Sequence, residues 1–207
     1  GEPSRVITHK SLERPTGIAI DSTRHRIYVA DSSNVTSRNQ AIRVFDEAGH
    51  YLQVFGAPAD TEHPSLFPTY LTLDGQGNLY ATDTLNAKVE VFAPDGRHVR
   101  TIGERGDAFG MFDKPKGVAL DSFGNVYVVD SAWSNVQIFN EWGQVLLFFG
   151  GRGYVPGLLF NPAGIAIDRG NRIYVADAFN GRVSIYQLIN TKAEDSLGVP
   201  GQPASVA

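Results

Sequence analysis

The stretch Pro115-Lys-Gly-Val-Ala-Leu-Asp121 decides the fold, because the chain repeats it in a fixed register. The other copies are Pro15-Thr-Gly-Ile-Ala-Ile-Asp21, Pro68-Thr-Tyr-Leu-Thr-Leu-Asp74 and Pro162-Ala-Gly-Ile-Ala-Ile-Asp168. A second block follows each copy: Ile27-Tyr-Val-Ala-Asp31, Leu79-Tyr-Ala-Thr-Asp83, Val126-Tyr-Val-Val-Asp130 and Ile173-Tyr-Val-Ala-Asp177. A third block ends every 47 residues, at Phe45, Phe92, Phe139 and Tyr186. This period indicates one supersecondary unit that is copied around an array.

Each repeat contains short runs of strand-forming residues between turn signals. In the third repeat these runs are 117–121, 126–130, 136–139 and 145–149, and they are rich in Val, Ile, Phe and Tyr. Asp95-Gly96 and Gly49 supply the positive φ angles that tight hairpins need. We therefore predict an all-β chain, a β-propeller of four-stranded antiparallel blades, with four blades visible in the sequence.

The two ends of the repeat array suggest how the last blade is completed. The last repeat has only three strand-like runs, whereas residues 5–9 resemble the fourth strands of other repeats. We expect this N-terminal strand to pair with residues 183–188 and close the last blade, which would protect the sheet edges. The predicted propeller domain covers residues 1–189, followed by a flexible tail at 190–207 that is rich in Pro, Gly, Ser and Ala. The expected blades span about 15–56, 68–103, 115–150 and 162–189 plus 5–9.

Composition narrows the classes of function. The net charge is −4 and the sequence pI is about 5.7, whereas nucleic-acid binders usually carry a basic excess. The chain has no cysteine, so disulfides and thiolate sites are excluded. No apolar run reaches the roughly 18 residues of a membrane-spanning helix. Nucleic acid is therefore an improbable partner, and no transmembrane segment is predicted.

The repeated blocks resemble the NHL repeat family over residues 5–189. The nearest matches are Asp83-Thr-Leu-Asn-Ala-Lys-Val-Glu-Val-Phe92 and Asp177-Ala-Phe-Asn-Gly-Arg-Val-Ser-Ile-Tyr186. The resemblance implies a propeller of the bacterial exported type, and such families usually form six-bladed rings. Three arrangements fit four blades: a four-bladed variant, a six-bladed ring whose first two blades precede residue 1, or a ring completed by another chain. We favour the second.

The most regular polar residues are aspartates at strand ends, at Asp31, Asp83, Asp130 and Asp177. Because every blade has one, we predict a structural role in which each carboxylate accepts backbone N–H groups of the following turn. The five histidines fall in places from which three imidazoles cannot converge, so we predict no zinc site, no metal and no cofactor.

Departures from the repeat suggest a binding surface. Tyr70 replaces a glycine of the other repeats, and Trp133 takes a position that is asparagine in the second and fourth repeats. With further apolar and cationic residues, they are predicted to form an apolar patch with a basic rim, as protein-binding surfaces have. The full predicted set is Arg38, Tyr70, Leu85, Lys88, Trp133, Phe179 and Arg182. Alternatively, Trp133 and Phe179 only cover the ends of their blades.

The sequence therefore favours a non-enzymatic protein-binding or scaffold module that acts through its loop-bearing face. A low methionine count and the absence of cysteine favour an extracytoplasmic place, in the periplasm or at the cell surface. One alternative is a metal-dependent propeller hydrolase that acts on esters or lactones, which would need oxygen ligands around the channel. Another is single-stranded RNA binding, with aromatic side chains as stacking platforms and the cations on phosphates.

Overall fold

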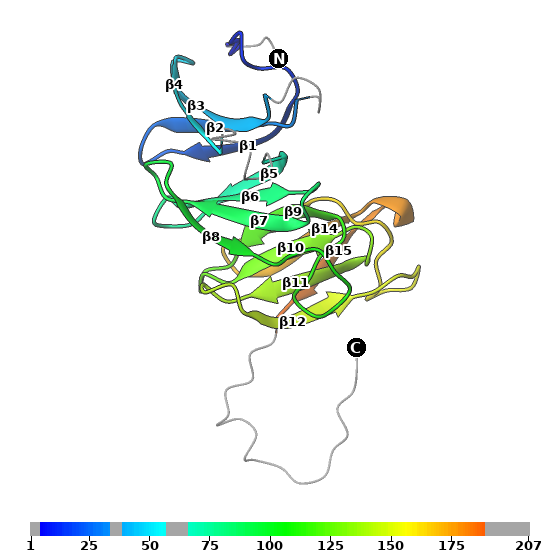
Figure 1. Ribbon diagram of the computed structural model, residues 1–207. Coiled ribbons are helices and arrows are strands. Elements are labelled where there is room, and N and C mark those ends of the chain that lie inside the picture. The colour runs from blue at the N-terminus through cyan, green and yellow to red at the C-terminus, as the bar shows by residue number, and fades with distance from the viewer. Residues whose placement is uncertain (1–4, 34–38, 57–65, 189–207) are drawn as a thin grey trace, which may run out of the picture.

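The computed structural model describes residues 5–33, 39–56 and 66–188, which form four antiparallel sheets in a row (Figure 1). The first sheet contains β1 (Pro15–Asp21), β2 (Arg26–Asp31), β3 (Ala41–Asp46) and β4 (Tyr51–Phe55). The second contains β5 (Pro68–Leu73), β6 (Leu79–Asp83), β7 (Lys88–Phe92) and β8 (His98–Ile102). The third contains β9 (Pro115–Leu120), β10 (Val126–Asp130), β11 (Asn135–Phe139) and β12 (Val145–Gly150). The fourth contains β13 (Ile165–Ile167), β14 (Arg172–Asp177) and β15 (Arg182–Gln187), with a 3-10 turn, η1 (Ala178–Asn180).

The predicted all-β propeller of antiparallel blades is confirmed. In every sheet the strands lie in chain order, so each blade is a meander. The first strands of neighbouring blades lie side by side, β1 against β5, β5 against β9, and β9 against β13. No other regular element besides the single 3-10 turn occurs in the described part of the chain.

An aspartate builds the turn between the first and second strands of a blade. In the fourth blade, Asp168 accepts backbone N–H groups from Gly170 at 2.8 Å and Arg172 at 3.0 Å. Its second oxygen accepts Arg172 Nε at 2.8 Å and the hydroxyl of Tyr174 at 3.1 Å. Hydrogen bonding from the Arg172 amide, followed by the Arg172 and Tyr174 side chains, lowers the pKa of Asp168 to about 2. The carboxylate is therefore the form that this turn requires.

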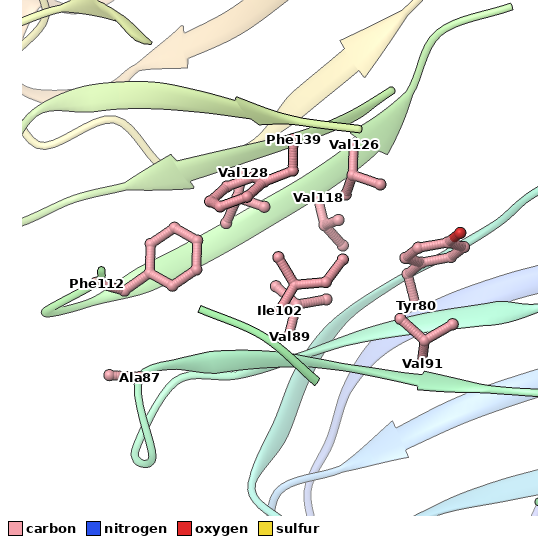
Figure 2. Packing of buried hydrophobic residues seen from close by; sticks show 10 residues of the cluster. All are labelled: Tyr80, Ala87, Val89, Val91, Ile102, Phe112, Val118, Val126, Val128 and Phe139. Atoms are coloured by element: carbon pink, nitrogen blue, oxygen red, sulfur yellow. The ribbon is translucent and has the colours of Figure 1, made fainter. Parts of the chain in front are cut away.

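The core lies between blades, in three apolar clusters that each join two neighbouring sheets. Figure 2 shows the cluster between the second and third sheets, where Val89 and Val91 of β7 face Val118 of β9 and Val126 of β10. All four valines are buried. Because both faces of an internal blade are covered in this way, its strands are apolar throughout rather than alternating.

Glycine permits the inner strands to approach one another. Gly117 of β9 donates its N–H to the carbonyl of Ala163 at 2.9 Å. A Cβ atom at this position would lie 2.8 Å from that same carbonyl oxygen and 2.8 Å from the Ile165 nitrogen. Gly17 has the same constraint, since its Cβ would lie 2.5 Å from the Thr69 oxygen. At these two positions glycine is thus a requirement of blade packing.

The first and last blades each leave one apolar face uncovered in the described part of the chain. Val136 and Ile138 of β11 are fully buried, yet the same repeat positions in β15, Val183 and Ile185, are 62% and 61% exposed. At the other end of the row, two isoleucines of the first strand are exposed to a similar degree, Ile18 and Ile20 of β1. The packing between blades that stabilises the interior is therefore incomplete at both ends.

The predicted N-terminal strand at residues 5–9 is wrong. These residues form no strand, and the fourth sheet consists of β13, β14 and β15 alone among the described residues. The segment lies on the first blade instead, where Arg5 donates to the Glu47 carbonyl at 2.6 Å. The ring of His9 stacks on Tyr51, with 4.5 Å between centroids. These contacts hold the segment at the opposite end of the row from β15, so it cannot complete the last blade.

The packing between blades can be tested at Ile138 of β11 and Ile185 of β15, which occupy the same position of the repeat. Ile138→Ala should lower the free energy of unfolding by about 2–4 kcal/mol, because it leaves a cavity between the third and fourth sheets. Ile185→Ala, at the same repeat position, should change it by less than about 0.5 kcal/mol, because the side chain is largely exposed. Urea unfolding of both variants measures the difference. Equal losses would mean that the β15 face is covered in solution.

The Asp168 turn predicts a pH dependence. The carboxyl should titrate near pH 2 in the folded chain, and Arg172→Ala should raise its pKa part of the way towards 3.8, because the exchange removes the guanidinium hydrogen bond and keeps that of the backbone amide. Because the folded pKa is depressed, the turn stabilises the fold fully above about pH 4 and loses this contribution as the pH falls towards 2. Carbon-13 NMR of the carboxyl group measures both values. An unchanged pKa in Arg172→Ala would contradict this account.

Candidate functional site

Buried aspartates fix the loops at one end of the blades. The carboxylate of Asp130, at the end of β10, accepts the backbone N–H of Asp113 at 2.8 Å and that of Lys114 at 3.2 Å. It also accepts the N–H of Ala132 at 2.9 Å and that of Trp133 at 3.1 Å. One buried carboxylate thus joins the loop between blades to the loop between β10 and β11. This geometry is what a structural role for the strand-end aspartates requires.

The equivalent aspartates make related contacts. Asp31 accepts the N–H groups of Glu13 at 2.7 Å and Arg14 at 2.9 Å, and Asp177 accepts that of Phe160 at 2.7 Å. Burial raises the pKa of Asp83, and its hydrogen bonds with Asn86 offset only part of that effect. Burial alone would also raise the pKa of Asp177, but hydrogen bonds from Asn180, the Phe160 amide and Arg182 hold it below its usual value. These carboxylates are engaged in holding loops.

The predicted cations are engaged in contacts within the chain. Lys88 Nζ lies 2.6 Å from Glu90 Oε1. Burial alone would raise the pKa of Glu90, but hydrogen bonds from Lys88, Thr101 and His98 hold it below its usual value. Arg182 donates to Asp177 at 2.8 Å and to the carbonyls of three residues in the loop between the third and fourth blades: Tyr154, Val155 and Leu158. These two cations therefore order loops rather than form a free basic rim.

The predicted apolar residues differ in their accessibility. Leu85, Trp133 and Phe179 are exposed at the same end of the second, third and fourth blades. Tyr70 is partly buried and packs against the cluster between the second and third sheets, so it belongs largely to the core. Arg38 lies outside the described residues. The structure thus places three of the predicted apolar side chains where a partner could reach them.

A pocket of about 270 Å³ opens beside Trp133. Its apolar walls come from Phe109 and Met111 of the loop between blades, Phe148 of β12, and Trp133 itself, which is 43% exposed. The rings of Phe109 and Phe148 meet edge to face, with 5.5 Å between centroids. Asn135 adds a buried amide oxygen for which no donor is found among the described residues. The pocket can therefore take an apolar side chain.

Side-chain amides make the walls of this pocket rigid. Gln137 of β11 accepts the N–H of Gly110 at 2.9 Å and donates to the carbonyl of Met111 at 2.7 Å. Asp130 holds the backbone of Trp133 from the other side. Both walls are thus fixed before any partner arrives, which reduces the entropy that binding would lose.

A second group of aromatic side chains lies at the same end of the fourth blade. Phe160 contacts Tyr154 and Phe179 edge to face, with centroids 5.2 Å apart in each pair. The guanidinium of Arg152 lies 4.7 Å from the centre of the Phe160 ring. Tyr154 and Phe179 are both largely exposed. The loop-bearing end therefore presents apolar surface on the third and fourth blades.

Sequence reasoning missed Phe109, Phe148 and Tyr154. Phe109 and Tyr154 lie in the loops between blades, which do not follow the repeat and so offer no consensus from which to depart. Phe148 had a signal, because Val145-Leu-Leu-Phe-Phe149 is apolar at every position although β12 is the outermost strand of its sheet. One face of such a strand is exposed, so an unbroken apolar run there indicates a surface for binding.

The described residues contain no group of three or more His, Asp or Glu side chains that could hold a metal ion. The alternative of a metal-dependent hydrolase therefore has no cluster of metal ligands to support it within that part of the chain. Within the same part, no helix is long and apolar enough to cross a membrane.

Comparisons with known proteins agree with this architecture. A model of the NHL repeat matches residues 161–186. No curated protein sequence matches the chain. Among solved structures, a streptogramin B lyase is similar with a TM-score of 0.62 and 15% identity, over 84% of this chain and 54% of that chain. Virginiamycin B lyase from Staphylococcus aureus is similar with a TM-score of 0.61 and 11% identity, over 89% of this chain and 58% of that chain.

A structure of a nidogen/laminin complex is also similar, with a TM-score of 0.56 and 20% identity, over 83% of this chain and 64% of that chain. Identities this low show the fold alone. The chain spans a little over half the length of the two lyases. Because the matched repeat at 161–186 is the fourth copy of a register that all four blades share, the chain is an NHL-repeat β-propeller.

Proposed function

We propose that this propeller is a non-enzymatic protein-binding module that uses its loop-bearing end. The observation that carries the proposal is the rigid pocket beside Trp133, which is lined by Phe109, Met111 and Phe148. Tryptophan and other aromatic side chains at the centre of an interface supply much of its binding energy. The exposed side chains of Leu85 on the second blade and Phe179 on the fourth extend this apolar surface.

The expected ligand element is an apolar side chain of a partner protein. A pocket of about 270 Å³ is small for a cofactor but suits one anchoring side chain. As part of the same proposal, the module acts outside the cytoplasm, in a periplasmic or cell-surface assembly. One similar structure was solved as a complex between two proteins, nidogen and laminin.

The alternatives have less support. Single-stranded RNA binding needs free cations near the aromatic rings, but Lys88 and Arg182 are engaged by Glu90, Asp177 and loop carbonyls. The net charge of −4 also opposes phosphate binding. Similarity to two lyases at 11–15% identity carries no activity over to this chain.

Removal of the Trp133 ring tests the proposal. In a crosslinking pull-down from the native host, quantified by mass spectrometry, Trp133→Ala should lower the recovery of a defined partner by about tenfold or more. Phe148→Ala should lower it as well, because it opens the opposite wall of the pocket. Purified partner and propeller should then bind directly, with the same loss in both variants.

Leu52→Ala is the matched control, since Leu52 is an exposed apolar side chain on the first blade, away from the pocket. It should leave recovery unchanged. Urea unfolding of each variant separates a loss of binding from a loss of fold. Recovery that is unaffected by Trp133→Ala in a folded protein, or the same partners lost in Leu52→Ala, would contradict the proposal.

A further inference from the structure

The opposite end of the blades carries a separate and larger cleft, of about 710 Å³, between the second and third sheets. Turns that join first to second strands form two walls, at residues 74–78 and 121–124. The turn between β11 and β12 forms a third, with Glu141 and Trp142. Arg100 of β8 lies among the lining residues. This cleft has no part in the proposed protein-binding site.

Two of the acidic groups in the lining are already committed to the turns. Asp74 accepts the N–H groups of Gln76 at 2.9 Å and Asn78 at 2.8 Å, and the Asn78 side chain at 2.8 Å. Asp121 makes the same set of contacts in the third blade. Each of the two also accepts a tyrosine hydroxyl, Asp74 that of Tyr80 at 3.4 Å and Asp121 that of Tyr127 at 3.0 Å. They are therefore poor candidates for metal ligands or for an acid and base. Their role is to hold the cleft walls in place.

Two aromatic rings stand exposed at this cleft without a structural reason. Trp142 is 71% exposed and Phe123 is 70% exposed, and neither ring contacts another ring among the described residues. The turn of Trp142 has alanine and aspartate at the same position in the first and second blades. The turn of Phe123 has glutamine and glycine at that position in the second and fourth blades. The turns thus form without these rings, whose exposure would be relieved by a ligand.

The backbone beneath both rings is fixed. The side chain of Asn140 accepts the N–H of Trp142 at 3.1 Å, and Asp121 accepts that of Phe123 at 2.9 Å. Next to Phe123, the N–H of Ser122 is bound by Asn171 of the fourth blade at 2.9 Å. The positions of the two rings are therefore set by the scaffold, as a preformed binding site requires.

The charges in the lining disfavour an anionic ligand, because Asp74, Asp121 and Glu141 outnumber Arg100. A cation gains little from Asp74 and Asp121, whose oxygens already accept donors of their own turns, and Arg100, which donates to the Tyr80 hydroxyl at 3.0 Å, adds a positive charge to the same lining. Gln76 offers a neutral side-chain amide and Glu141 a carboxylate, and no hydrogen bond of either side chain is found among the described residues. A suitable ligand is uncharged, both donates and accepts hydrogen bonds, and has flat C–H surfaces that pack on aromatic rings.

We propose that this cleft binds a neutral oligosaccharide. Trp142 and Phe123 pack against the C–H faces of the sugar rings, and Gln76 and Glu141 bind hydroxyl groups. The cleft volume of about 710 Å³ can hold more than one sugar ring. Its polar walls suit a hydrated ligand whose contacts include bridging water.

The chain contains two tryptophans, one at each of the two sites, which makes the test specific. In the Trp133→Phe variant, Trp142 is the only tryptophan and its fluorescence reports on this cleft. Maltohexaose, cellohexaose, chitohexaose and mannohexaose are titrated into this variant separately, and at least one should change the emission in a saturable manner. A further Phe123→Ala exchange should weaken that binding by about tenfold or more, and Gln76→Ala should weaken it to a smaller degree.

Leu146→Ala serves as the control, because Leu146 is an exposed apolar side chain of the same blade that does not line the cleft. It should bind the sugar as the parent variant does. The proposal is overturned if none of the four hexasaccharides changes the emission at millimolar concentration, or if Leu146→Ala weakens binding as much as Phe123→Ala. It is also overturned if hexalysine or hexaglutamate saturates the signal in place of the sugars. Because the pull-down reports on the Trp133 pocket, failure of one proposal leaves the other standing.

Discussion

Burial of blade faces against neighbouring blades is the constraint on which the rest of this structure depends. A single four-stranded sheet cannot cover its own apolar side chains, and here three clusters cover them by joining adjacent sheets. The close approach of β9 to β13 at Gly117 fixes the spacing of the inner strands. Every loop is then held at a set distance from the loops of the next blade. The two ends of the row are surfaces of defined shape for this reason.

A second set of interactions converts that scaffold into sites. Buried carboxylates at strand ends bind backbone N–H groups of loops from the same blade and of the connection that enters it, as Asp130 does for Lys114 and Trp133. A buried carboxylate is favourable only where such donors surround it, so the loop conformation and the charge depend on each other. Loss of one such aspartate would therefore release two loops at once. The same residue that appears purely structural positions the aromatic ring of the candidate pocket.

The sequence predicted the blades well because the core positions of the third strands recur every 47 residues and a strand-end aspartate recurs in every blade. It failed at residues 5–9, since a short run with strand propensity does not specify which sheet it joins; contacts with Glu47 and Tyr51 decided that. It located Trp133 as a departure from the repeat but not Phe109, whose loop follows no repeat. It also counted Lys88 and Arg182 as free cations, because ion pairs such as Arg182 with Asp177 depend on side-chain geometry that spacing alone does not show.

The repeat itself indicates where function should be sought. A residue that all four blades share has a structural role in the fold, as the turn aspartates have, and it cannot distinguish one ligand from another. A residue that occurs in one blade alone, at an exposed position, has no such structural role. Trp142 stands where the first and second blades have Ala48 and Asp95, and all three turns form with glycine at the next position. The exposed tryptophan therefore contributes nothing that the turn needs. Its side chain is therefore available to a ligand, and a repeat scaffold can in this way carry a binding residue without any change in its turns.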